Sequence, residues 1–167
     1  MSRTSDMTPA LVIRAGDPAE PAARALIAAL DAQMQALYPA ESNHLLDIDA
    51  LRAPAVTFLV AELEGDVCGC AAFVRCHGYV ELKRMVVAPQ ARGRGIARAL
   101  VGALESRAWA EGFRTARIET GIHQPEALAL YDRTGYQVRD AFGDYAQDPL
   151  SVFMEKTLVA PPGANPC

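Results

Sequence analysis

The chain has 167 residues, of which 51% are apolar and 22% are charged, and its formal net charge is −4. Such a length suits one domain with a sizeable hydrophobic core and is short for two ordinary domains. The net charge is negative and the sequence contains no extended basic stripe, so we expect no nucleic-acid partner.

The ends of the chain bear on where the protein resides. Residues 1–10 are polar and lack the apolar run of a signal peptide, and no stretch approaches the length of a membrane span. We therefore expect a cytoplasmic protein without a membrane partner. We assign residues 1–10 to a flexible N-terminus, residues 11–158 to a single domain and residues 159–167 to a flexible C-terminal tail.

Four cysteines raise the question of a metal site or a disulfide. Cys68, Cys70 and Cys76 fall in one apolar stretch, and Cys167 ends the chain. A metal pair at Cys68-Gly69-Cys70 would need a second pair of Cys or His at zinc-ligand spacing, and none follows. We expect reduced, mostly buried thiols and no bound metal.

The first elements predicted along the chain are a strand, a long helix and a short helix. Residues 11–14 form an apolar strand closed by a Gly-Asp-Pro turn. Apolar residues then recur at the spacing of one helix face over residues 19–38, with Asp17 and Pro18 as the cap and first turn. After a turn-rich loop, residues 47–53 indicate a short second helix, which a proline ends.

Three further strands are predicted, the first two from apolar runs rich in Val, Phe and Cys. The runs cover residues 55–63, 67–76 and 79–88, and short turns that contain glycine separate them. Such turns between apolar runs are typical of hairpins. The three runs therefore predict an antiparallel meander.

The last strand of the meander leads into a loop with two arginines and two glycines, and then into a helix. The strand ends at Pro89, and the helix opens near Gly93. Its first N–H groups lack intrahelical partners, and the helix dipole adds roughly half a positive charge at that end. Gly93 and Gly95 leave the backbone open to an anion, while Arg92 and Arg94 add positive charge. The stretch predicts a phosphate cradle, unless its glycines serve only the turn.

Two familiar phosphate-binding loops do not fit this stretch. A dinucleotide-binding loop would need a third glycine at the position that Arg98 occupies. A Walker loop would need a Gly-Lys-Ser/Thr sequence, which does not follow. The cradle therefore has to belong to another class of phosphate-containing ligand.

The rest of the chain predicts a parallel strand, a helix and two final strands. The helix after the cradle stops at Gly112, and residues 114–120 return as a strand, parallel to the one before the cradle through a right-handed crossover. Pro125 opens a helix that runs to Arg133 and terminates at Gly135. The final strands are predicted at residues 136–138 and 150–158.

The loop sequence Gln90-Ala91-Arg92-Gly93-Arg94-Gly95 resembles the acyl-CoA signature Gln/Arg-x-x-Gly-x-Gly/Ala of the GCN5-related N-acetyltransferases (GNAT). The likeness extends to the strand at residues 81–87, the helix at 96–111 and the helix and turn at 127–136, in the same order. The resemblance implies an α+β GNAT fold. Its mostly antiparallel mixed sheet would have about six or seven strands, splayed between strands 4 and 5 and flanked by about four helices.

The resemblance also implies acetyl-CoA as the cosubstrate. In the family, the acyl-pantetheine arm enters the gap between the splayed strands, and a strand N–H polarises the acyl carbonyl, here near Met85 or Val86. The family often has Asn where this chain has Gln124, so the contact of that longer amide stays open. The implied acetyl-CoA-binding residues are Met85, Val86, Val87, Arg92, Gly93, Arg94, Gly95, Ile96, Ala97 and Gln124.

Two residues stand where the family commonly carries catalytic groups. Tyr131 matches a tyrosine that protonates the departing CoA thiolate as general acid, although it could instead be a core residue. Glu81 matches a glutamate that acts as general base, often through a water, but it could instead pair with Lys83 or Arg84. His123 is a second candidate base.

Two loops are candidates for contact with the acceptor. In the family, the region between the first two helices usually lines the acceptor pocket, although an ordinary polar loop would look similar. A late aromatic and acidic loop could bind the ammonium group of the acceptor. The candidates are Tyr38, Glu41, Asn43 and His44 from the first loop, and Asp144 and Tyr145 from the second.

Residues and resemblance together predict an enzyme, an acetyl-CoA-dependent N-acetyltransferase. It would acetylate an amine of a small molecule or peptide by direct attack in a ternary complex. The family also makes a homodimer an expected assembly. The alternative is a non-catalytic acyl-CoA-binding or regulatory module of the same fold, against which the presence of both Glu81 and Tyr131 argues.

Overall fold

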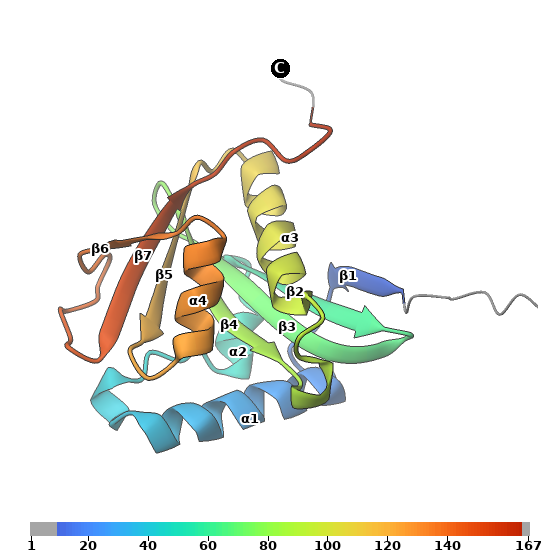
Figure 1. The fold of residues 1–167 in the computed structure, drawn as a ribbon, viewed down its shortest axis with the longest axis horizontal. Helices are drawn as coiled ribbons and strands as arrows, with labels where there is room; N and C mark the ends of the chain where they lie inside the picture. The colour runs from blue at the N-terminus through green and yellow to red at the C-terminus, as the bar shows by residue number, and fades with distance from the viewer. Residues whose placement is uncertain (1–9, 165–167) are drawn as a thin grey trace, which may run out of the picture.

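The structure, a computed structural model, describes residues 10–164 of the chain. Within this range, seven strands form one sheet in the order β1-β2-β3-β4-β5-β7-β6 (Figure 1). Neighbouring strands are antiparallel except β4 and β5, which are parallel. The strands are β1 (Leu11–Ala15), β2 (Val56–Leu63), β3 (Asp66–Arg75), β4 (Val80–Val87), β5 (Thr115–Gly121), β6 (Gln137–Arg139) and β7 (Ser151–Thr157).

Helices cover both faces of the sheet. They are α1 (Pro21–Leu37), α2 (Ile48–Leu51), α3 (Ile96–Ala110) and α4 (Pro125–Arg133), with short 3-10 turns η1 (Ala40–Ser42) and η2 (Pro89–Ala91). Figure 1 shows α3 and α4 in front of the sheet, where Leu100 and Tyr131 belong to the larger apolar cluster. Ile27 of α1 and Leu51 of α2 belong to a second cluster on the opposite face of the sheet. This architecture confirms the α+β fold expected from the sequence, with a mostly antiparallel mixed sheet of seven strands flanked by helices.

The two parallel strands separate shortly after they meet. β4 and β5 pair only between Val80–Leu82 and Ala116–Ile118. Beyond these residues, β4 continues to Val87 with β3 as its ladder partner, and β5 continues to Gly121 with β7 as its partner. The expected splay between strands 4 and 5 is therefore present, and it opens the sheet from within.

A β-bulge lies in β4 at the start of the splayed segment. The pairing with β3 shifts register between Cys70 and Ala72, whose partners on β4 are Val86 and Lys83. Arg84, inside this interval, has φ of 59°, a left-handed conformation that is uncommon for residues other than glycine. The bulge changes the direction of β4 just where the strand leaves β5.

The predicted start of the first helix is wrong, although its extent is close. α1 begins at Pro21 with Glu20 as its N-cap, rather than at Asp17 and Pro18. The Asp17 carboxylate accepts a hydrogen bond from the Ala19 N–H (2.9 Å) and so closes a turn ahead of the helix. Proline suits the first helical position because the N–H that it lacks has no intrahelical partner there.

The predicted terminal segments fall largely outside the described residues. Residues 1–9 and 165–167, including Cys167, are not described, so the assignments made there stay predictions. Cys68 and Cys70 are buried free thiols and Cys76 is half-buried. Among the helices that the structure describes, none combines the length and apolar character needed to cross a membrane.

Candidate active site

The splay between β4 and β5 opens onto a cavity of about 440 Å³. α1, the loop after it, the splayed ends of both strands and the start of α4 contribute its walls. A second cavity of about 470 Å³ lies between the N-terminus of α3 and α4. The two cavities share lining residues, namely Val87, Arg92, Ala97, Glu126 and Leu130. The two cavities therefore adjoin each other, and together they extend from the start of α3 to the end of α1.

The sequence predicts a phosphate cradle at the loop before α3 and the first turn of that helix, residues 92–98. Gly93 (φ 78°) and Gly95 (φ 75°) are left-handed, and Gly95 caps α3 without a side chain. The first backbone hydrogen bond into the helix runs from Ala99 N–H to the Gly95 carbonyl. Within the described residues, the N–H groups from Gly93 to Arg98 have no hydrogen-bond acceptor. Six consecutive free N–H groups at a helix N-terminus fit a pyrophosphate.

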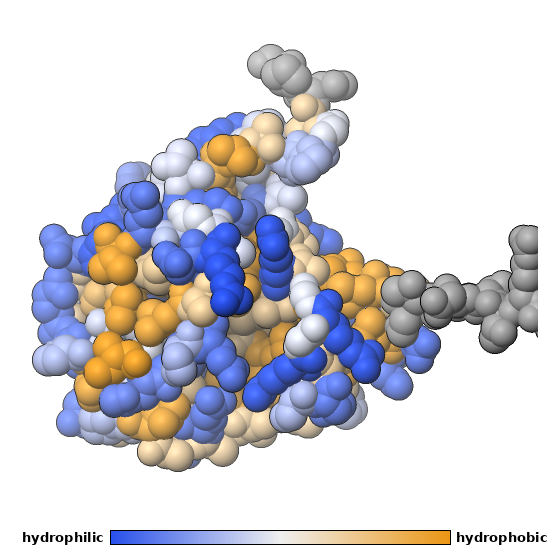
Figure 2. Space-filling view, viewed as in Figure 1, coloured by the Kyte–Doolittle hydropathy of each residue, from blue (hydrophilic) through white to orange (hydrophobic). Residues whose placement is uncertain are grey.

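Arginines surround the cradle. Arg92, Arg98 and Arg133 are exposed and line the second cavity, and Arg94 is exposed beside it. Figure 2 shows strongly hydrophilic side chains gathered between α3, α4 and the loop before α3. Among residues 10–164, none of these four guanidinium groups forms an ion pair with a carboxylate. Their charge is therefore available to a polyanionic ligand.

The splayed part of β4 provides backbone groups to the first cavity. Met85, Val86 and Val87 all line it, and Val86 and Val87 pair with β3 on their other side. A strand that lacks a ladder partner on one side presents free backbone groups there. These groups agree with the role that the sequence predicts for Met85 and Val86.

The bulge is held by the side chain of Arg84, which is only 6% exposed. Its Nε donates a hydrogen bond to the Leu46 carbonyl (2.8 Å), and its Nη1 lies 2.5 Å from Asp31 Oδ1 on α1. Both contacts are charge-assisted and therefore stronger than neutral hydrogen bonds. Arg84 thus ties the bulge to α1 and to the loop that follows η1.

The candidate acid Tyr131 lies on α4 and lines the first cavity. Its ring packs edge-on against Tyr136, with centroids 5.5 Å apart. Burial raises the pKa of Tyr131, so the hydroxyl stays protonated at neutral pH. No group in the described part of the chain accepts or donates a hydrogen bond at this hydroxyl, which leaves it available to a bound ligand.

Glu81 is the general base predicted from the sequence, with an ion pair to Lys83 or Arg84 as the alternative. In the structure it forms the ion pair with Lys83. Its Oε2 accepts a hydrogen bond from the Tyr145 hydroxyl (2.6 Å) and lies 3.2 Å from Lys83 Nζ. Lys83 Nζ also donates to Tyr145 Oη (2.6 Å) and to the His44 carbonyl (3.0 Å). Lys83 lines the cavity, whereas Glu81 and Tyr145 do not. These residues join β4 to the two predicted acceptor loops.

A carboxylate that the sequence reasoning missed, Glu119, lines the cavity from β5. Burial raises the pKa of Glu119, against the opposing effects of a hydrogen bond and of the nearby His44 and Lys83. Its Oε1 accepts a hydrogen bond from the Ser151 hydroxyl (2.8 Å). No cation within the described residues lies at ion-pair distance from it. A half-buried, unpaired carboxylate with a raised pKa is a candidate general base.

The far end of the cavity is closed by residues from α1 and from the loop between β5 and α4. Tyr38 stacks on His123, with ring centroids 5.6 Å apart and 25° between the planes. The Tyr38 hydroxyl accepts a hydrogen bond from the His123 backbone N–H (3.0 Å). A Cβ at Gly121 would overlap this hydroxyl, so the contact requires glycine there. Both rings and Gly121 line the cavity.

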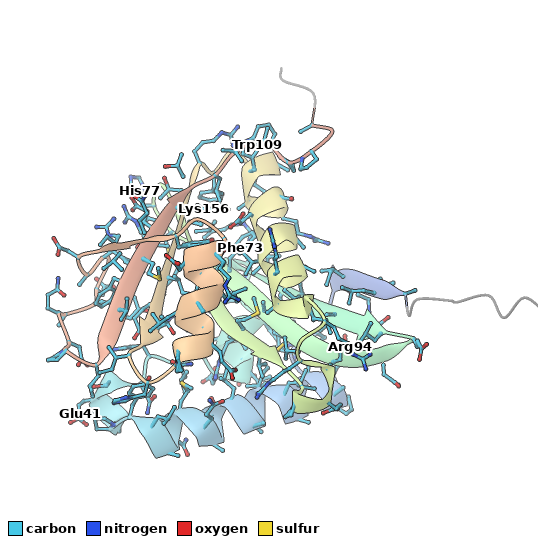
Figure 3. The ribbon with its side chains drawn as sticks, viewed as in Figure 1. Glu41, Phe73, His77, Arg94, Trp109 and Lys156 are labelled. Carbon is cyan, nitrogen blue, oxygen red and sulfur yellow. The ribbon has the colours of Figure 1, made fainter. Side chains whose placement is uncertain are left out.

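The other predicted site residues divide between the cavity and the surface. Asn43 and His44 line the cavity, but Glu41 and Asp144 are exposed and do not. Figure 3 places Glu41 beyond the C-terminal end of α1, on the side of the molecule away from Arg94. Arg94 itself lines neither cavity, in contrast to the other predicted cradle residues.

Gln124 lines the cavity as the N-cap residue of α4, but its side chain does not cap the helix. Its Oε1 accepts a hydrogen bond from the Gly121 N–H (3.0 Å). The longer arm of glutamine therefore reaches back to the end of β5. The amide nitrogen is the part of this side chain left for a ligand.

Comparison with known proteins identifies the family. The sequence profile of the acetyltransferase (GNAT) family matches residues 23–136. The chain is 45% identical over 152 residues to an IAA acetyltransferase of Azospirillum brasilense, a match that covers 90% of this chain and 99% of the relative. It is 34% identical over 131 residues to an uncharacterized N-acetyltransferase of Bacillus subtilis, covering 75% of this chain and 85% of the relative.

Solved structures agree with this relationship. A proposed acyl-CoA N-acyltransferase from Klebsiella pneumoniae superposes with a TM-score of 0.75 at 41% identity, covering 89% of this chain and 98% of that one. A GNAT acetyltransferase from Elizabethkingia anophelis with acetyl-CoA bound shares the fold, with a TM-score of 0.67 at 15% identity and coverages of 89% and 98%. The chain therefore belongs to the acetyltransferase (GNAT) family and is an acyltransferase.

Proposed function

We propose that the protein acetylates an amine of a small molecule or peptide, with acetyl-CoA as donor, by direct attack in a ternary complex. One observation carries this proposal. The cavity at the splay adjoins the cavity beside the N-terminus of α3 and is lined by the half-buried carboxylate of Glu119. The two adjoining cavities thus suit the pyrophosphate, the thioester and a base beside the acceptor.

The reaction forms a C–N bond and breaks the C–S bond of the thioester. The acceptor enters as an ammonium ion, loses one proton, and its nitrogen attacks the acetyl carbonyl carbon. The electron pair of the C–S bond leaves on sulfur as the CoA thiolate. Nitrogen loses two protons in all, of which one neutralises the thiolate and one passes to solvent.

Glu119 takes the role of general base in this proposal. Its unpaired carboxylate attracts the ammonium ion, and its raised pKa brings its basicity closer to that of the group it deprotonates. Glu81 is held by Lys83 and Tyr145 and lies off the cavity, so we assign it a supporting role. His123 remains a second candidate, since it lines the cavity.

Backbone and phenol groups act on the thioester. An N–H of Met85 or Val86, on the free side of β4, donates to the carbonyl oxygen as negative charge develops there. Tyr131 protonates the departing thiolate. Burial raises the pKa of Tyr131, but a thiolate released into the same cavity is also desolvated and becomes a stronger base.

The test is the release of CoA thiol from acetyl-CoA across a panel of amines, with mass spectrometry of the products. The expected result is an N-acetylated amine formed in step with free thiol, and a loss of at least tenfold in rate for Glu119→Gln. Binding of acetyl-CoA without turnover on any amine would favour the alternative, a non-catalytic acyl-CoA-binding module.

A further inference from the structure

We propose that the acceptor is a monoamine whose body is uncharged and apolar or aromatic. The inference rests on the proposed function and concerns the part of the cavity remote from the cradle. We call this part the acceptor end. Its apolar and aromatic lining residues are Leu30, Met34, Tyr38, Leu45, His123 and Leu150, its charged ones are Lys83 and Glu119, and Ser42, Asn43 and His44 add polar groups.

Two cationic side chains of β4 that line this cavity, Lys83 and Arg84, are already held by other protein groups. Lys83 Nζ makes hydrogen bonds to the His44 carbonyl and to Tyr145 Oη, and it lies 3.2 Å from Glu81. Two of the three N–H donors of this ammonium group are therefore used, and its charge is paired with Glu81. Arg84 is bound in the same way by the Leu46 carbonyl and Asp31. Neither side chain has a free charge to offer an acceptor.

Glu119 is the one charge at the acceptor end that lacks an opposite partner. Ser151 donates to its Oε1, and within the described chain no group hydrogen-bonds to its Oε2. The other carboxylate that lines the cavity, Glu126, also lines the second cavity and so belongs to the cradle side. The acceptor end can therefore compensate one ammonium ion, at Glu119, and no second one.

This charge count argues against two common classes of amine. A diamine or polyamine would place its second ammonium against Leu30, Met34 or Leu150, where no carboxylate compensates it. An α-amino acid would bring its carboxylate within a few ångströms of its own ammonium, and hence close to Glu119. Like charges at that distance in a partly buried site repel strongly.

The walls of the acceptor end suit an apolar or aromatic body. Leu30 and Met34 are buried on α1 and pack with Tyr38, and Leu150 lies against the same cluster. The stacked rings of Tyr38 and His123 add a flat surface on which an aromatic ring can pack. Leu45, at 36% exposure, extends this apolar surface outward.

The first experiment compares matched amines under one set of conditions. The probes are 2-phenylethylamine, phenylalanine, which adds a carboxylate to the same skeleton, and 1,4-diaminobutane and spermidine, which add cations. We expect kcat/KM for 2-phenylethylamine to exceed each of the others by at least tenfold. A preference for spermidine or phenylalanine would overturn this inference while leaving the proposed function intact. Lack of turnover with all four probes would also overturn this inference, whereas the proposed function is decided by the broader panel of amines.

The second experiment adds charge to the acceptor end. Leu45→Glu supplies a second carboxylate at a partly exposed position, where folding is expected to tolerate it, and Leu45→Gln is the uncharged control. We expect the ratio of kcat/KM for 1,4-diaminobutane to that for 2-phenylethylamine to rise at least tenfold in the Glu variant and to change little in the Gln variant. If the ratio of the two kcat/KM values is unchanged in folded Leu45→Glu protein, the acceptor does not bind at the acceptor end.

Discussion

Partial burial of the ionised Glu119 carboxylate lowers the stability of the folded protein. Burial is the main cause of its raised pKa, so the unfolded chain releases this proton at a lower pH than the folded protein does. Between the two pKa values the folded state binds more protons, and its stability falls as the pH rises. Below the ordinary glutamate pKa both states are protonated, and the effect vanishes.

Glu119→Gln should therefore change activity and stability in opposite directions. We expect the rate to fall about a hundredfold, since general bases contribute roughly 10²–10⁴ in rate. The variant should unfold at a higher temperature than the native protein at pH 7, and this difference should shrink as the pH is lowered below 4.5, the ordinary value for Glu. Kinetics and thermal unfolding at two pH values measure both effects. Glu41→Gln, at an exposed carboxylate, is the control.

Tyr131 and Tyr136 form a natural pair for testing the acid. Tyr131→Phe should reduce kcat at least tenfold with little change in the dissociation constant for acetyl-CoA, because only the proton donor is removed. Tyr136 donates its hydroxyl hydrogen bond to Glu105 (3.0 Å), away from the cavity lining. Tyr136→Phe should therefore affect stability rather than kcat. Equal kcat values for the native protein and Tyr131→Phe would exclude Tyr131 as the acid.

The bulge in β4 depends on a backbone conformation and on a side chain at the same position. Arg84→Gly accepts φ of 59° more readily than arginine but loses the contacts with Asp31 and Leu46. We expect a net destabilisation of about 1–3 kcal/mol by denaturant unfolding, because the lost charge-assisted bonds outweigh the relieved backbone. Arg84→Lys keeps the charge and should recover part of this loss. A more stable glycine variant would contradict the importance of the side chain.

The cradle can be tested by separating charge from backbone strain. Gly93 has φ of 78°, and no atom lies within 4 Å of a Cβ placed there. Gly93→Glu should weaken acetyl-CoA binding at least tenfold, about 1.4 kcal/mol, by placing a carboxylate against the pyrophosphate. Gly93→Ala introduces similar backbone strain without the charge and should weaken binding less. Equal affinities of native and Gly93→Glu proteins by calorimetry, with the fold retained, would refute the cradle.

For the molecule as a whole, the helices, strands and turns that depend on neighbouring residues were predictable from the sequence. Apolar periodicity gave the position of α1 apart from its first residues, and the glycine turns gave the β2-β3-β4 meander. The helix α4 runs from Pro125 to Arg133, and Gly135 (φ 98°) follows it, both as predicted. These features depend on a few adjacent residues, whose chemistry is visible in the sequence itself.

What could not be predicted depends on contacts between distant segments. The strand around Glu119 alternates, so its charged face could have been expected in solvent, but Glu119 is half-buried in the cavity wall and accepts a hydrogen bond from Ser151 of β7. A glutamate on a strand flanked by a polar loop was the only available signal. The left-handed conformation of Arg84 was equally hidden, because Asp31 and Leu46 hold that side chain from α1 and its loop.

The short pairing of β4 with β5 also bears on how the protein avoids self-association. Unpaired strand edges on a protein surface recruit strands from other chains and promote aggregation. Here two such edges face each other across a cavity of about 440 Å³, where a strand of a second molecule has little room to enter. The enzyme can thus keep backbone groups free for an amide-containing ligand without displaying them to neighbouring molecules.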